Sequence, residues 1–142
     1  MRKQAGLLVI VVALLTPLAA SAATTHESFD VTGFVFPCPT HTYTVTSGAI
    51  KFLMHVSVDA SGRGHFTVTE TPNHVVLTDE DGNLYSLRGA IRFGGASEEE
   101  LKTATHMFNI VGAGGVSDSI KLVERFRFGE LISRDFGSCE LP

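Results

Sequence analysis

Apolar and polar residues alternate along most of the chain after residue 27, with the period of two that is typical of half-buried β-strands. Ile50, Phe52 and Met54 fall on one face of such a strand, and Lys51 and His55 fall on the other. The pattern predicts strands over residues 28–36, 41–47, 49–58, 105–112, 119–128 and 130–136, besides those of two hairpins. The chain beyond its first segment is therefore expected to be built almost entirely of strands.

Two short segments predict tight hairpin turns. DASGR at residues 59–63 and DEDGN at residues 79–83 each place a glycine, Gly62 or Gly82, where a three-residue loop needs a left-handed backbone. The first turn would pair Val56 with Phe66 and Met54 with Val68. The second would pair Leu77 with Tyr85 and Val75 with Leu87. Both registers keep the large apolar side chains on one face, which supports the turn assignment.

Eight or nine strands joined mostly by short turns predict an all-β fold. We expect an antiparallel up-and-down β-barrel of about eight strands, because closing the sheet hides its edges. A two-sheet β-sandwich is the alternative. Ser97 and Glu100 resemble a capping box, so residues 97–104 are expected to form one or two helical turns. Residues 112–118, rich in glycine, are expected to form a flexible loop.

The first residues have the composition of a secretory signal peptide. Arg2 and Lys3 precede the apolar run GLLVIVVALL at residues 6–15, and the small residues ASA follow at 20–22. The run is shorter than the roughly 20 apolar residues that span a membrane. We therefore expect residues 1–22 to be a signal peptide, residues 23–142 to be a single domain, and the protein to be secreted, with the periplasm or cell envelope as alternative locations.

The charge of the chain argues against two classes of partner. The formal net charge is −4, and no run of Lys or Arg is present. A nucleic-acid binder needs a basic surface, and a membrane-surface helix needs a basic amphipathic segment, so neither partner is expected. The sequence does not define an oligomeric state.

Cys38 and Cys139 are the two cysteines of the chain. In an exported protein an isolated pair most simply forms a disulfide. Closing a loop of about 100 residues would stabilise the fold by up to about 4–5 kcal/mol in the chain-entropy model. A catalytic thiol is the rival interpretation, and the oxidising compartment argues against it.

One carboxylate lies in the apolar phase of a predicted strand. In SIKLVERFRFG, residues 119–129, Glu124 falls between Leu122 and Phe126. A buried carboxylate must be paired, hydrogen-bonded or protonated. Glu70 shares this property on its own strand. His106 is in phase with the core-facing residues of its strand. Arg88 is one residue out of phase on its own strand and would face the core only through a bulge. These four residues, Glu124, Glu70, His106 and Arg88, are the candidate ligand-binding residues, and a structural polar bridge is the alternative.

Two histidines of the first hairpin form a second candidate group. The predicted register places His55 and His65 as diagonal neighbours on the polar face, with Asp59 near the turn. Two His and one distant carboxylate fall short of a metal signature, so surface histidines are the expected outcome. No nucleophile elbow and no phosphate-binding loop is present, and no cofactor is expected.

The order of several short motifs resembles that of a group of small exported bacterial proteins without an assigned function. These motifs are PCPTHTYTVTSGAIKFLMHVSVDASGRGHFTVTE from residue 37, LVERFRFG from residue 122, and the late Cys139. The resemblance implies an exported β-barrel-like domain with a Cys38–Cys139 bridge, and it implies no activity.

Three functions remain open at this point. The leading hypothesis is a secreted barrel that binds a small, mostly apolar ligand, with Glu124 as the polar anchor and His106 as its partner. The second is a structural or interaction protein of the cell exterior with a packed core. The third is an isomerase- or cyclase-type enzyme in which Glu124 is an acid or base. We expect binding rather than catalysis.

Overall fold

The computed structural model describes residues 21–140, except for the side chains of Ser21, Ser138 and Glu140. Within this part of the chain all regular structure is β, without a helix. The strands are β1 (Ser21–Asp30), β2 (Val35–Pro37), β3 (Thr42–Val58), β4 (Gly64–Thr78), β5 (Leu84–Arg88), β6 (Ile91–Ala96), β7 (Lys102–Gly112), β8 (Gly115–Arg127) and β9 (Glu130–Glu140). The predicted signal peptide lies outside the described residues, apart from Ser21 and Ala22, which begin β1. No helix in the described segment could cross a membrane.

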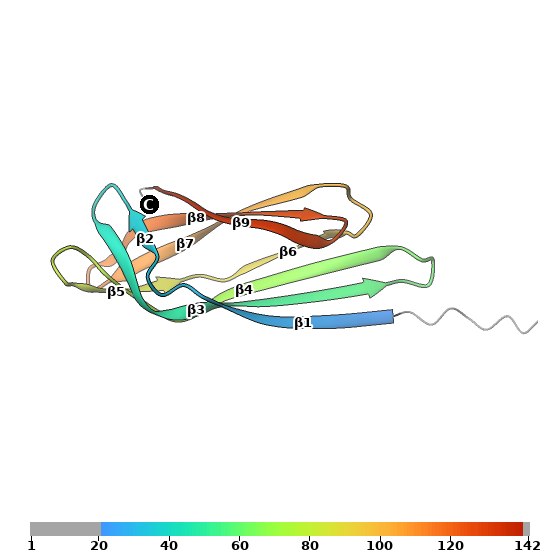
Figure 1. The fold of residues 1–142 in the computed structure, drawn as a ribbon, viewed down its shortest axis with the longest axis horizontal. Coiled ribbons are helices and arrows are strands. Elements are labelled where there is room, and N and C mark those ends of the chain that lie inside the picture. The colour runs from blue at the N-terminus through green and yellow to red at the C-terminus, as the bar shows by residue number, and fades with distance from the viewer. Residues whose placement is uncertain (1–20, 141–142) are drawn as a thin grey trace, which may run out of the picture.

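The strands form one antiparallel sheet in the order β1-β3-β4-β5-β7-β8-β9, with β2 also paired to β3 and β6 to β4. Figure 1 shows an elongated molecule in which β1, β3 and β4 run along one side and β7, β8 and β9 along the other. The sheet is curled into a half-barrel, so the all-β, up-and-down barrel-like fold is confirmed. It is one continuous sheet, whereas a sandwich would have two.

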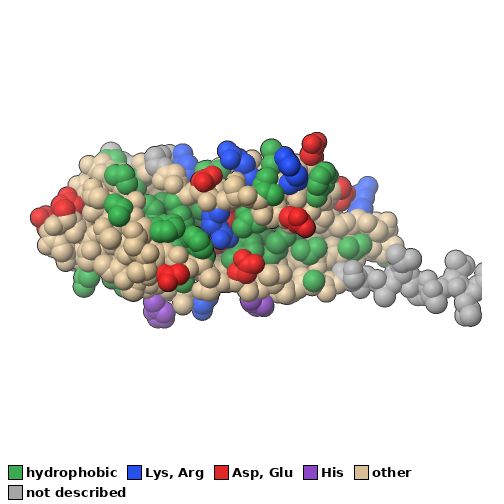
Figure 2. Space-filling model, viewed as in Figure 1, with side chains coloured by type: hydrophobic (Ala, Val, Ile, Leu, Met, Phe, Trp, Pro, Cys, Tyr) green, Lys and Arg blue, Asp and Glu red, His purple; other side chains and the backbone are tan. Residues whose placement is uncertain are grey.

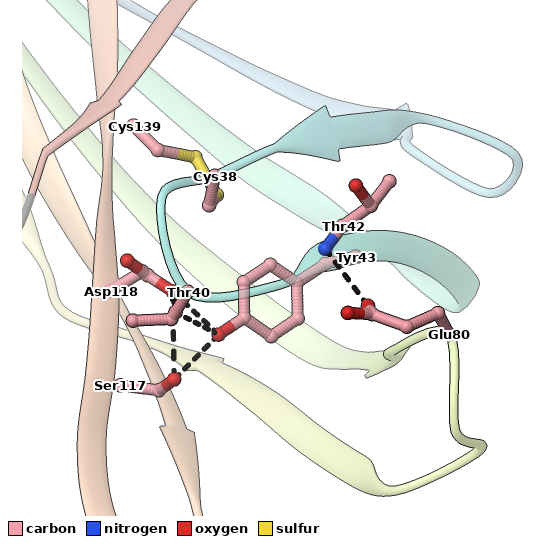
Figure 3. Close-up of a disulfide and its surroundings, with 8 residues drawn as sticks. All are labelled: Cys38, Thr40, Thr42, Tyr43, Glu80, Ser117, Asp118 and Cys139. Atoms are coloured by element: carbon pink, nitrogen blue, oxygen red, sulfur yellow. Dashed lines mark hydrogen bonds between the residues drawn. A yellow bond between two sulfur atoms is a disulfide. The ribbon is translucent and has the colours of Figure 1, made fainter.

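The two end strands of the sheet, β1 and β9, have no ladder between them in the described segment. This unpaired boundary is the seam of the half-barrel. At one end of the seam, Cys38, which follows β2, is bonded to Cys139 of β9, with their Cα atoms 5.0 Å apart. The predicted disulfide is therefore present (Figure 3). It joins the two edges covalently where backbone hydrogen bonds do not.

Both predicted hairpin turns are present. Gly62 and Gly82 have φ angles of 84° and 83°. The Asp59 N–H donates to the Arg63 carbonyl at 2.9 Å, and the Asp79 N–H donates to the Asn83 carbonyl at 3.2 Å. The register pairs Val56 with Phe66, Met54 with Val68, and Leu77 with Tyr85, as expected. Local turn chemistry therefore sets the pairing of both hairpins.

Two predicted strands have different bounds from those expected. Residues 41–47 and 49–58 form one strand, β3, which continues through a bulge at Gly48 (φ 110°). Residues 28–36 do not form one strand, because β1 ends at Asp30 and β2 begins at Val35. Asp30 Oδ1 accepts a hydrogen bond from the Thr32 N–H at 2.8 Å, which forms a local turn between them.

Two predicted irregular segments are also corrected. Residues 97–104 contain no helical turn; a turn at Ser97 leads into β7, which begins at Lys102. Residues 112–118 are largely strand, because β7 and β8 continue to Gly112 and Gly115 around a tight turn. A capping-box pattern needs a following apolar helical stripe, and after Ser97 none occurs.

The core consists of two hydrophobic clusters along the length of the molecule. The larger contains Tyr43, Ile50, Phe108 and Leu122, and the smaller contains Phe52, Phe66, Val68 and Phe126. Along β8 the inward positions run from Leu122 in the larger cluster, through Glu124, to Phe126 in the smaller. A charged residue therefore lies where the two clusters meet.

Candidate functional site

Glu124 is buried, with no exposed surface, at the inward position that the sequence predicts. Its cross-strand neighbours are Ala104 on β7 and Arg134 on β9. Arg134 Nε donates a hydrogen bond to Glu124 Oε1 at 2.9 Å. The buried carboxylate is therefore paired across the last hairpin with a cation.

Glu70, on the opposite side of the half-barrel, reaches the same cation. Its side chain is also without exposed surface, and its Oε1 accepts a hydrogen bond from Arg134 Nη2 at 3.0 Å. Arg134 thus bridges β4 and β8, which lie on opposite sides of the sheet's curl (Figure 1). We call Glu70, Glu124 and Arg134 the charged triad.

Arg134 is held between aromatic rings as well as carboxylates. Its guanidinium carbon lies 5.4 Å from the Phe29 ring centroid and 5.0 Å from that of Phe52. Such cation–π contacts stabilise a cation more when water is largely excluded. Only 13% of the Arg134 side chain is exposed, so its orientation is set by these four groups.

Arg134 is not among the site residues predicted from the sequence. The available signal was its position two residues before Phe136, on the same face of a strand. The β8–β9 pairing has a register shift between Arg125 and Phe126. This shift obscures the alternation of β9, because the β9 residues nearer the turn change face relative to Arg134. The partner of Glu124 was therefore not recognised.

Burial of the two glutamates favours the protonated form of Glu70 at neutral pH. Oε2 of Glu70 and Oε2 of Glu124 are buried and accept no hydrogen bond from other described groups. Burial raises the pKa of Glu70 to about 8, and the hydrogen bond and charge of Glu124 act in the same direction, against the lowering effect of Arg134. Glu70 is therefore protonated at pH 7 and adds no charge beside the Glu124–Arg134 ion pair.

His106 lies beside the triad but is not bonded to it. Its ring stacks on Phe93, with centroids 4.8 Å apart, and its buried Nε2 has no hydrogen-bond partner among the described groups. Burial lowers the pKa of His106, against the raising effect of Glu124's charge. His106 is therefore a neutral neighbour of the site.

Arg88 is not brought to the triad. Its pairing with Asn109 continues the register of Leu87 with Ile110, so the bulge that would turn it inward is not formed. Arg88 is exposed, and its Nε donates to Ser86 Oγ at 3.0 Å. Of the four candidate residues, the structure brings three together and places the fourth on the outside.

A cleft of about 570 Å³ opens along the seam, with Arg134 in its wall. We call it the seam cleft; it is lined by Phe29, Phe34, Val35, Phe36, Pro37, Arg134, Asp135, Phe136, Gly137 and Cys139. The Phe34 and Phe136 rings meet edge to face at 5.6 Å. Figure 2 shows hydrophobic side chains gathered along the middle of this face, with basic and acidic side chains among them. The cleft combines an aromatic wall with one partly buried cation.

A second polar cluster surrounds the disulfide end of the molecule (Figure 3). Asp118, fully buried on β8, accepts hydrogen bonds from Thr40 Oγ1 and from the Tyr43 hydroxyl, the latter at 2.6 Å. Tyr43 also lies 2.5 Å from Ser117 Oγ. Burial and the Asp118 carboxylate raise the pKa of Tyr43. Asp118 was missed although it continues the inward alternation of Ile120 and Leu122, because its segment was interpreted as a loop.

The histidine candidates for a metal site lie on the surface of the first hairpin. Asp59 Oδ2 is 3.4 Å from His65 Nε2, while His55 Nδ1 lies 3.0 Å from Thr24 Oγ1. No three His, Cys, Asp or Glu side chains in the described segment are arranged to hold a metal ion.

No protein family, curated protein or solved structure was found to match this chain. Function must therefore be argued from the geometry of the seam cleft and the charged triad.

Proposed function

We propose that this is an exported binding protein that takes up a small, mostly apolar ligand in the seam cleft, with Arg134 as the polar anchor. The observation that carries the proposal is the junction of an aromatic wall, formed by Phe29, Phe34 and Phe136, with the partly buried guanidinium of Arg134. The Cys38–Cys139 disulfide is compatible with export.

The size and lining of the seam cleft support this function. Small-molecule sites typically have volumes of about 300–1,000 Å³ and combine apolar walls with a few polar groups. The seam cleft, at about 570 Å³, falls within this range. Its position between two unpaired strand edges gives a ligand access without opening the sheet.

The ligand position proposed here differs from the one suggested by the alternation pattern alone. Phe52, Phe66 and Phe126 fill the interior beside the triad and are at most 4% exposed. Glu124 Oε1 is already bonded to Arg134. Arg134, which lines the cleft, therefore replaces Glu124 as the proposed anchor, and Glu124 acts by orienting it.

A structural protein of the cell exterior is the second candidate. It is favoured by the two hydrogen bonds through which Arg134 joins β4 to β8 and thereby holds the two sides of the half-barrel together. In that case the triad serves the fold alone and the cleft stays empty.

Binding of Nile red, a neutral apolar dye whose fluorescence rises in apolar surroundings, separates the two candidates. Val35 lines the cleft and is 55% exposed, whereas Leu101 lies outside it and is 54% exposed. Val35→Asp should weaken dye binding at least fivefold, because it places a charge at the cleft, and the matched control Leu101→Asp should leave binding unchanged. Native mass spectrometry of the exported protein, compared with its denatured mass, would detect a retained ligand. An absence of dye binding, or equal loss in both variants, would contradict the proposal.

A further inference from the structure

We propose that the seam cleft selects electrically neutral ligands that present a hydrogen-bond acceptor, such as an ester or ketone carbonyl, and that it discriminates against ionised acids. This inference rests on the proposed function, since it specifies the chemical class of ligand that the same cleft would accept.

The charges within the triad cancel one another. Arg134 contributes one positive charge, and its ion pair with the Glu124 carboxylate, at 2.9 Å from Nε, cancels it. Glu70 adds no charge while it is protonated. Because both glutamates are buried, a protonated Glu70 is favoured over a second negative charge beside Glu124. The guanidinium is thus already neutralised from within the protein, and no net positive charge is left to attract an anion.

Arg134 has more hydrogen-bond donors than the two glutamates use. A guanidinium has five N–H donors. Arg134 uses Nε and Nη2 for the two glutamates, and its Nη1 donates to none of the described groups. Because Arg134 lines the cleft, these remaining donors can be met by an acceptor oxygen of the ligand. The anchor offers hydrogen bonds rather than charge.

The remaining ionisable groups around the cleft do not restore a positive field. Arg134 and Asp135 are the charged residues of its lining, and Asp135 is exposed. The nearby His106 is neutral, because burial lowers its pKa. A carboxylate bound at Arg134 would lie close to Glu124, and Asp135 adds a second acidic group to the cleft lining. Like charges in a partly buried site oppose binding. A quaternary ammonium head group has no acceptor atom, so it would leave the remaining Arg134 donors unmet.

Three ligands with the same chain test this selectivity on the disulfide-bonded protein at pH 7.4. Methyl decanoate, decanoate and decyltrimethylammonium would each be tested for displacement of bound Nile red, the two ions below their critical micelle concentrations and the ester below its solubility limit. Methyl decanoate should displace the dye at a concentration at least tenfold lower than decanoate or decyltrimethylammonium.

Glu124→Gln, made in a Glu70→Gln background so that Glu70 cannot ionise in its place, supplies the critical variant. The carboxamide retains an acceptor for Arg134 but removes the cancelling charge, so the advantage of methyl decanoate over decanoate should shrink at least tenfold. Glu130→Gln, at an exposed position of β9 outside the cleft, makes the same change in net charge and should leave the ratio as in the wild type.

The outcomes distinguish the two proposals. If neither Nile red nor methyl decanoate binds, the binding function itself fails. The binding function stands and the selectivity is wrong in either of two cases. In the first, both bind but decanoate has the same affinity as its ester; in the second, Glu124→Gln leaves the ratio of the methyl decanoate and decanoate affinities unchanged. If Glu124→Gln does not fold, the wild-type ratio among the three ligands alone decides.

Discussion

At the scale of single residues, the charged triad explains why a carboxylate occupies a core-facing position of a strand. Glu124 can be buried because it is ion-paired with Arg134, and the proton on Glu70 leaves the group of three without net charge. Removing one partner of such a buried group is expected to cost about 3–5 kcal/mol, because the other is left uncompensated. The proton on Glu70 is thus part of the folded structure, and it makes stability depend on pH.

We predict that Glu70→Gln removes a pH dependence of stability between pH 4.5 and about 8. In the unfolded chain Glu70 has its ordinary pKa of 4.5, whereas the pKa in the folded protein is about 8. Within this window the folded state binds the extra proton, so the free energy of unfolding falls as pH rises, by up to about 1.4 kcal/mol per pH unit. The contribution is fully present below pH 4.5 and is lost above pH 8. Gln does not titrate, so the variant should show a flatter profile.

Urea unfolding at pH 5, 7 and 9 measures this effect. Glu130→Gln, exposed on the same hairpin as Arg134, is the matched control and should follow the wild type. Parallel profiles for wild type and Glu70→Gln would show that Glu70 is ionised in the folded protein.

At the scale of the elements, β-bulges and turns decide how the alternating strands bend and pair. In β3 the bulge at Gly48 lets a single strand of 17 residues pass from β2 pairing to β1 pairing. In the last hairpin, Phe128 and Gly129 have φ angles of 49° and 76°, as a two-residue turn requires, and Arg127 pairs with Glu130. Such points carry the curvature that turns a flat ladder into a half-barrel.

We predict that Gly48→Ala destabilises the protein by about 3 kcal/mol or more. A Cβ at this position would collide with Val75 Cα and would lie 2.5 Å from the His74 carbonyl oxygen, and φ is 110°. Both the strained backbone and the collision with backbone atoms of β4 oppose the substitution. Chemical denaturation measures the loss of stability.

Gly114→Ala is the control for this substitution. A Cβ there would meet nothing within 4 Å, so its effect should stay within about 0.5 kcal/mol. Equal stabilities of the Gly48 and Gly114 variants would mean that β3 can relax away from β4.

At the scale of the whole molecule, the seam is the distinctive feature. The sheet's path starts at β1 and stops at β9, and the disulfide joins Cys38 to Cys139 over a sequence separation of 101 residues. Arg134 of β9, through Glu70 of β4, ties the two sides together farther along. The seam is thus closed at discrete points, which leaves room for a cleft between them.

We predict that replacing Cys38 and Cys139 together with Ala lowers the free energy of unfolding by up to about 4–5 kcal/mol, as the chain-entropy model gives for a loop of this length. In the folded variant, loss of amide-exchange protection should concentrate in β2 and β9, because the bond joins these elements directly. Hydrogen exchange read by mass spectrometry gives the distribution. The β3–β4 hairpin is the internal control, and protection lost equally there would show that the bond stabilises the whole fold rather than the seam.

The sequence by itself determined the local features of this protein. Period-two alternation predicted the strands and the inward positions of Glu70, Glu124 and His106, and the DASGR and DEDGN turns set two hairpin registers. These features depend on neighbours a few residues apart, so a single chain displays them directly. Because the chain has two cysteines, a disulfide within it could be predicted only as Cys38–Cys139.

Only the tertiary structure decided which residues meet across the half-barrel. It paired both glutamates with Arg134, left Arg88 outside, and formed the seam cleft from residues of β1, β2 and β9. Alternation specifies the face of a strand, but not the strand that lies opposite after the sheet has curled. A bulge shifts that phase by one residue, as in β9, where Leu131 pairs with Phe126 and Ser133 with Arg125, and thereby changes which side chains face the interior.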